Sequence, residues 1–171
     1  KDPANRIHEF ELLVERTHKA GLKVIIDFVP NHVARQYHSD SKPAGVRDLG
    51  EDDDTSHSFS PQNNFYYLHS EQLHLDNIMQ GSTYQEVPAK ATGNDNFTSW
   101  PNRNDWYETI KLNYGIDIIS GRHVHFCPTP DTWQKMLQIL LYWASKGIDG
   151  FRCDMAEMVP VEFWEWALPQ V

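Results

Sequence analysis

Two segments of the sequence repeat the same order: a helical pattern, a glycine and a short strand pattern. Residues 3–20 show helical periodicity, Gly21 fits a C-terminal cap, and residues 23–29 (KVIIDFV) form a β-branched apolar run. The order returns with a helical pattern over residues 131–146, another glycine and a strand pattern over residues 148–154 (IDGFRCD). Helices that alternate with buried strands predict an α/β protein whose two strands are parallel.

The chain between these segments follows a different pattern. Residues 33–115 are polar and rich in Asn, Asp, Ser and Gly, with aromatic clusters in NNFYYLH and TSWPNRNDWYETI. A loop this long without structure of its own is uncommon in a compact domain. We therefore expect an inserted lobe, irregular and partly β, while residues 1–32 and 116–171 form the α/β part.

The composition indicates which classes of ligand the chain can bind. The net charge of −9 argues against nucleic acid as a partner and suits a neutral or cationic ligand. No apolar run approaches the length of about 18 residues that a membrane segment needs, so none is expected. Aromatic residues are plentiful and include six Trp, which fits either a sugar-binding surface or a well-filled core.

The second strand pattern ends in two charged residues. Side chains alternate along a strand, so Phe151 and Cys153 face one side while Arg152 and Asp154 face the other. An arginine this close stabilises the ionised carboxylate, and an ionised, oriented carboxylate is what attack on a sugar C1 atom requires. The pair predicts a site at the carboxyl end of the strand; a structural ion pair is the alternative.

The first strand pattern continues into DFVPNH, residues 27–32. Pro30 ends regular strand pairing, so we expect Asn31 and His32 in the loop at the carboxyl end of the strand. Barrel enzymes keep their catalytic groups at this end of their strands. The alternative is a turn asparagine beside a hydrogen-bonded histidine.

The two runs together resemble the α-amylase family, glycoside hydrolase family 13. The family has D-x-x-x-N-H after its third barrel strand and G-x-R-x-D on its fourth, and the matching residues are Asp27, Asn31, His32, Gly150, Arg152 and Asp154. The segment KLNYGID, residues 111–117, is similar to the family's short motif near the end of its inserted domain B. The resemblance covers nearly the whole chain and implies a partial (β/α)8 TIM barrel, two parallel strands with flanking helices, with residues 33–115 as domain B.

The resemblance also implies roles for single residues. Asp154 would be the glycosidic nucleophile and Arg152 its ionic partner. His32 would hydrogen-bond the sugar in the cleaved subsite, and Asp27 would orient the site from below. These roles imply a retaining α-glucan hydrolase of the α-amylase type, which cleaves α-1,4-glucosidic bonds in starch or malto-oligosaccharides through a glycosyl-enzyme.

A calcium ion is a further implication of the resemblance. Asn31 would be a ligand where domain B meets the barrel, and Asp117 its partner, because calcium prefers oxygen ligands. The sequence departs from many α-amylases at Glu157 and Met158, where Lys and His stand in those enzymes. We therefore expect no side-chain role at Met158; its backbone carbonyl is the group that would reach the ion.

Several activities share these motifs. The alternatives are a cyclodextrinase or neopullulanase, a transglycosylase or isomerase of the same family, and a non-catalytic glucan-binding relative. The family's general-acid Glu and its third carboxylate, on strands five and seven, would lie beyond Val171. A complete barrel needs about 250 residues, so the 171 residues alone are expected not to hydrolyse starch.

Overall fold

A computed structural model describes residues 5–40 and 42–171. Its helices are α1 (Arg6–Lys19), α2 (Asp131–Ala144) and α3 (Val161–Ala167), with 3₁₀ turns η2 (Ala156–Met158) and η3 (Leu168–Gln170). Its strands are β1 (Ile25–Phe28), β2 (His32–Ala34), β3 (Tyr67–Leu68), β4 (Ala89–Lys90), β5 (Thr109–Lys111), β6 (Ile116–Asp117), β7 (His123–Val124) and β8 (Gly150–Cys153). The predicted mixture of helices and strands is confirmed. Within the described residues the strands form four two-stranded sheets and no closed barrel.

The two strands predicted from the repeated pattern lie side by side and are parallel. β1 pairs with β8 in a register that sets Asp27 opposite Arg152. Both strands are shorter than predicted, by two residues at the amino-terminal end and by one at the carboxyl-terminal end. At the amino-terminal ends, the Asp149 backbone N–H donates to the Val24 carbonyl, and the Val24 amide donates to the Asp149 carboxylate, both at 2.8 Å, so a side chain and the backbone together continue the contact between the two segments.

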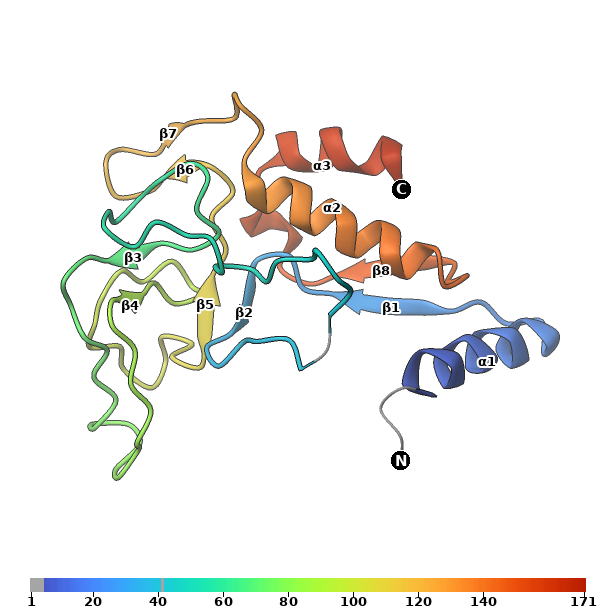
Figure 1. The fold of residues 1–171 in the computed structure, drawn as a ribbon, viewed down its shortest axis with the longest axis horizontal. Coiled ribbons are helices and arrows are strands. Elements are labelled where there is room, and N and C mark those ends of the chain that lie inside the picture. Colours follow the sequence, from blue (N-terminus) through green and yellow to red (C-terminus); the bar gives the residue numbers. More distant parts are fainter. Residues whose placement is uncertain (1–4, 41) are drawn as a thin grey trace.

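Helix α2 covers one face of this strand pair (Figure 1). Phe28 of β1 and Phe151 of β8 meet edge to face on that side, with ring centroids 5.9 Å apart. Met136, Leu137 and Leu140 of α2 are buried in the same cluster. Burial of this apolar face is the main force that holds the helix on the strands.

The tryptophans divide between the core and the surface. Trp133 is buried next to Phe163 of α3, whose side chain is fully buried, and their ring centroids lie 5.8 Å apart. Trp100 and Trp106 are exposed in the inserted segment. Core packing therefore accounts for some of the aromatic residues and leaves others on the surface.

Helix α1 is attached to the opposite end of the strand pair from the lobe (Figure 1). It runs from Arg6 to Lys19, within the predicted 3–20, and residues 3 and 4 lie outside the described part of the chain. Gly21 adopts a left-handed φ of 75°, as expected for a residue that ends a helix. Phe10 packs edge to face on Trp143 at the end of α2, with centroids 5.4 Å apart.

Short strands β2 to β7 and long connections form a lobe beyond the carboxyl ends of β1 and β8 (Figure 1). Polar contacts order its interior. The buried guanidinium of Arg35 lies 2.5 Å from the buried carboxylate of Glu86 and also donates to the Tyr107, Lys90 and Thr109 carbonyls. The boundaries predicted for this lobe, residues 33 and 115, stay a prediction.

One local expectation was wrong. His32 does not lie in a loop: it begins β2 and pairs with Lys111 of β5 in an antiparallel ladder. Pro30 does end β1, but the chain re-enters a second sheet within two residues, because the segment of Lys111 offers it a new partner. Among the described helices, none combines the length and the apolar character needed to cross a membrane.

The packing of α2 predicts that two neighbouring leucines contribute differently to the free energy of unfolding. Leu140 is 2% exposed and Leu141 is 40% exposed. Leu140→Ala is expected to lower the free energy of unfolding by about 2–5 kcal/mol, because it removes transfer energy and leaves a cavity. Leu141→Ala is the matched control and should cost clearly less. Urea unfolding of both variants measures the difference, and equal losses would contradict this packing of α2.

Candidate active site

A row of three charged side chains lies at the carboxyl ends of β1 and β8. Arg152 Nη2 lies 3.1 Å from Asp154 Oδ1, and Arg152 Nη1 lies 3.3 Å from Asp27 Oδ2. The backbone N–H of Asp154 donates to the Phe28 carbonyl at 2.9 Å, which continues the strand pairing through this residue. One guanidinium therefore bridges two carboxylates that come from different strands.

This row is open to solvent within the described chain. The side chains of Asp27 and Arg152 are 65% and 61% exposed, and that of Asp154 is 34% exposed. Exposed ion pairs add little to stability, typically about 0–1 kcal/mol. The effect of Arg152 on Asp154 is thus mainly to orient the carboxylate and to balance its charge.

His32 lies within electrostatic reach of Asp154, and its hydrogen bonds define its proton position. Burial lowers the pKa of His32. The Asp154 carboxylate raises this pKa, and the Lys111 ammonium lowers it. These effects together favour the neutral form of the ring. The Asn31 side-chain N–H₂, which can only donate, contacts His32 Nδ1 at 3.2 Å. This contact assigns the ring proton to Nε2, which is then a hydrogen-bond donor.

A buried ammonium group lies next to His32. Lys111 is 4% exposed, and its Nζ donates to the Asn31 side-chain carbonyl. The same nitrogen lies 2.7 Å from the Asp95 carboxylate and 3.4 Å from the Met158 carbonyl oxygen. Burial lowers the pKa of Lys111, while the Asp95 carboxylate raises it. Three oxygens from three separate segments thus surround one cation that belongs to the chain itself.

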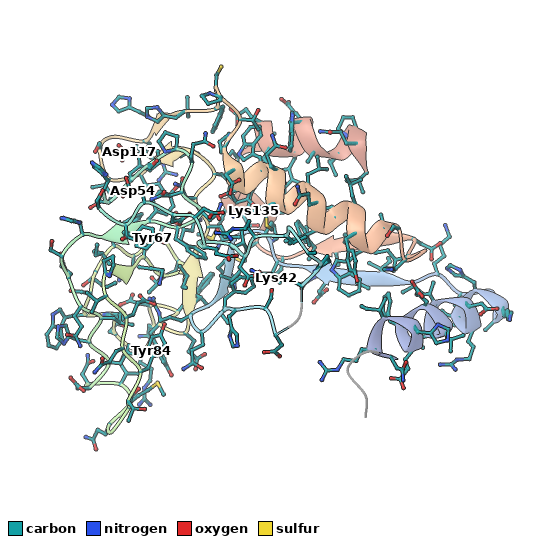
Figure 2. All side chains as sticks on the ribbon, viewed as in Figure 1. Lys42, Asp54, Tyr67, Tyr84, Asp117 and Lys135 are labelled. Carbon is teal, nitrogen blue, oxygen red and sulfur yellow. The ribbon has the colours of Figure 1, made fainter. Side chains whose placement is uncertain are left out.

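The residues expected to hold calcium do not fit that ion in this arrangement. The Asn31 carbonyl oxygen that calcium would use already accepts a hydrogen bond from Lys111. Asp117 lies on β6, where its carboxylate accepts a hydrogen bond from the Ser120 amide, toward the outer side of the lobe (Figure 2). Across residues 5–40 and 42–171, no three His, Cys, Asp or Glu side chains converge on a possible metal position. We derive no step of the chemistry from calcium.

Gly93 fixes the position of His32 from the other side. A Cβ atom at residue 93 would lie 2.9 Å from the His32 Cβ and 2.7 Å from the Thr109 hydroxyl oxygen, closer than real contacts allow. The Gly93 carbonyl also accepts a hydrogen bond of 2.8 Å from the Asn31 side chain. Only glycine lets this backbone approach the histidine so closely.

Strained backbone borders the same region. Among the described residues, the non-glycine residues with positive φ are Ser70, Asp95, Trp106, Arg122 and Met155. Asp95 contacts Lys111, Trp106 lies beside His32, and Met155 follows Asp154. Residues in unfavourable backbone regions often cluster at functional sites, where neighbouring contacts hold them.

Six site residues were predicted from the sequence, and four further residues at the site were not. Asp27, Arg152 and Asp154 form one row, and Asn31 and His32 adjoin it, whereas Asp117 lies elsewhere in the lobe. The residues missed are Gly93, Asp95, Trp106 and Lys111. Lys111 stands in the KLNYGID segment, so that motif was a signal for it; the others lie in the irregular segment, where no periodicity predicts a fold.

Comparisons with known proteins place the chain in a family. The model of the Alpha-amylase family, described as the alpha amylase catalytic domain, matches residues 6–167. Maltase 1 of Drosophila virilis is 26% identical over 148 residues, 86% of this chain and 20% of that protein. The alpha-glucosidase of Apis mellifera is also 26% identical over 148 residues, 86% of this chain and 22% of that protein.

A third relative is named as a transporter heavy chain and not as a glycosidase. The amino acid transporter heavy chain SLC3A1 of Mus musculus is 26% identical over 153 residues, 88% of this chain and 19% of that protein. The chain therefore spans about a fifth of the length of the curated relatives it matches.

The buried ammonium yields a prediction about stability. Lys111→Met removes the cation and leaves the Asp95 carboxylate and the Asn31 carbonyl without their partner. Breaking a buried ion pair by removing one partner typically costs about 3–5 kcal/mol, so we expect a loss near the lower end in urea unfolding, since Asp95 is partly exposed.

Two controls separate the loss of a buried ion pair from the loss of an exposed one and from an effect of calcium. Lys19 is 71% exposed in its ion pair with Glu15, so Lys19→Met should leave the unfolding midpoint almost unchanged. In the unaltered protein, a chelator should not shift the melting temperature, because Lys111 supplies the positive charge. A chelator-induced fall in the melting temperature that added calcium reverses would contradict this assignment.

Proposed function

This chain belongs to the alpha-amylase family of catalytic domains, and on that premise we propose that it contributes the nucleophile of a retaining α-glucan hydrolase. The observation that carries the proposal is the Asp27–Arg152–Asp154 row at the ends of two parallel strands. In this proposal the chain supplies part of a (β/α)8 barrel, and the lobe over its strand ends is domain B.

In the first step, an oxygen of Asp154 attacks C1 of the sugar and forms a glycosyl-enzyme ester. The bond from C1 to the leaving oxygen breaks, and a carboxylic acid from outside the 171 residues protonates that oxygen. Arg152, 3.1 Å from Asp154 Oδ1, keeps the carboxylate turned toward the substrate. In the second step, water deprotonated by the same outside carboxylate hydrolyses the ester, so the anomeric configuration is retained.

His32 binds the sugar whose C1 reacts. Its neutral ring presents an Nε2 proton, because Nδ1 accepts from Asn31. Such a donor can hydrogen-bond a sugar hydroxyl without adding a charge that would compete with Arg152 for Asp154. Asp27 supports the site indirectly, through the opposite side of the Arg152 guanidinium.

The relatives guide the choice of substrate. Two of them are named a maltase and an alpha-glucosidase, which supports malto-oligosaccharides with α-1,4 bonds as the substrates. Among the alternatives of the same fold, a transglycosylase or an isomerase passes the glycosyl group to a sugar hydroxyl, whereas a cyclodextrinase or neopullulanase passes it to water and differs in the substrate it accepts. Chromatography of the products from maltotriose separates hydrolysis, which yields only shorter oligosaccharides and glucose, from transglycosylation or isomerisation. Comparison of the rates on maltotriose, cyclodextrin and pullulan separates the hydrolases from one another.

A non-catalytic relative is the second candidate, and the transporter heavy chain among the relatives favours it. The charges of this chain argue against it. A binding module has no chemical need for an arginine that orients an accessible carboxylate beside a neutral histidine, yet Arg152, Asp154 and His32 are all present.

The nucleophile assignment yields a prediction for the complete protein that contains this chain. Asp154→Asn keeps the shape and the hydrogen-bonding capacity of the side chain but removes the charge that attacks C1. We expect kcat on maltotriose to fall by about 10³-fold or more. The melting temperature and the affinity for maltotriose should change little.

The matched control is another aspartate changed to asparagine. Asp40 has an 87% exposed side chain in the lobe, so Asp40→Asn should retain full activity. If Asp154→Asn kept a substantial part of the activity while Asp40→Asn behaved as expected, Asp154 would not be the nucleophile. Absence of any activity in the unaltered complete protein would favour the non-catalytic candidate.

A further inference from the structure

An exposed aromatic ring lies beside the histidine of the site. The rings of Trp106 and His32 have centroids 5.5 Å apart and planes tilted by 60°. The side chain of Trp106 remains 37% exposed. An indole that could be buried but stays exposed next to a ligand-binding residue is available for contact with the ligand.

The backbone holds this ring in one place against its own preference. Trp106 has a φ of 47°, in the left-handed region that bulky residues avoid. Thr109 secures the conformation, since its backbone N–H and its hydroxyl both donate to the Trp106 carbonyl, at 2.8 and 2.7 Å. The preceding Asp105 carboxylate accepts from the Asn102 amide at 2.8 Å, which closes the turn that leads to the tryptophan.

A hollow of about 450 Å³ lies next to the indole. Its lining residues are Arg103, Asn104, Trp106, Tyr107, Glu108 and Thr109. Four of these residues carry polar or charged side chains that can donate or accept hydrogen bonds, and Trp106 and Tyr107 supply aromatic surface. Small-molecule sites are usually lined mainly by apolar and aromatic side chains, and this hollow is more polar than that, as suits a ligand with many hydroxyl groups.

We propose that Trp106 is a substrate-binding residue that packs against the apolar face of a pyranose ring. A neutral sugar ring presents C–H groups on its faces and hydroxyls around its edge. The C–H groups suit the electron-rich face of an indole, and the polar side chains of the hollow suit the hydroxyls. The inference rests on the proposed function and adds a specificity residue: the ring bound by His32, or its neighbour, lies against Trp106.

Trp100 provides a comparison within the same lobe. It is 58% exposed, but one face of its indole is stacked on His74, with centroids 3.8 Å apart and planes 10° apart. His74 is not one of the residues around Asp154, Arg152 and His32. Trp100 therefore controls for any general affinity of exposed indoles for sugars.

The experiment measures maltotriose binding by calorimetry in the complete protein that carries Asp154→Asn, which prevents turnover. Trp106→Leu keeps apolar bulk without an aromatic face and should weaken binding about tenfold, equivalent to about 1.4 kcal/mol. Trp106→Phe keeps an aromatic face and should retain most of the affinity. Both variants should melt within a degree or two of the parent, as expected for a partly exposed residue.

Trp100→Leu is the control that separates a specific role of Trp106 from a general affinity of exposed indoles for sugars. Trp100→Leu should leave the affinity unchanged. Equal affinity for Trp106→Leu and its parent, or equal losses for Trp100→Leu and Trp106→Leu, would overturn the role of Trp106 while leaving the proposed function intact. If the protein with both tryptophans bound no maltotriose, the proposed function would fail, and the role of Trp106 with it.

Discussion

The ammonium group of Lys111 joins the three segments that build the candidate site. Its partners are Asn31 after β1, Asp95 in the lobe and the backbone of Met158 after β8. Each oxygen alone would be costly to bury, and the cation would be costlier still without them. Because they meet at one point, the lobe cannot move relative to the strand ends without separating a buried charge from its partners.

The contacts of Lys111 also influence His32, one of the residues of the proposed chemistry. Asn31 donates to His32 while it accepts from Lys111, so the position of the cation and the proton position of the histidine are linked. Gly93 limits the histidine from the other side. Asp154, by contrast, is positioned by the strand pairing and by Arg152. The site therefore combines a buried support in the lobe with a solvent-exposed ion-pair row on the strands.

Much of this could be predicted from the sequence, for physical reasons that differ between residues. The alternation of side chains along a strand placed Arg152 and Asp154 on one side, and the repeated helix–glycine–strand order predicted the parallel pair that brings Asp27 to them. These features depend on local periodicity. The entry of His32 into β2 and the contacts of Asp95 depend instead on pairing across the irregular lobe, which no local pattern encodes.

The central claim, that Asp154 is a nucleophile, is tested most directly by trapping its ester. The complete protein is treated with a fluorinated α-glucosyl fluoride, whose ring fluorine slows hydrolysis of the glycosyl-enzyme, and is then digested with trypsin. Cleavage after Arg152 gives a peptide that begins at Cys153. The account predicts one fluoroglucosyl mass on this peptide, located on Asp154 by fragmentation. A label on Glu157 in the same peptide, or on a carboxylate elsewhere in the protein, would contradict it.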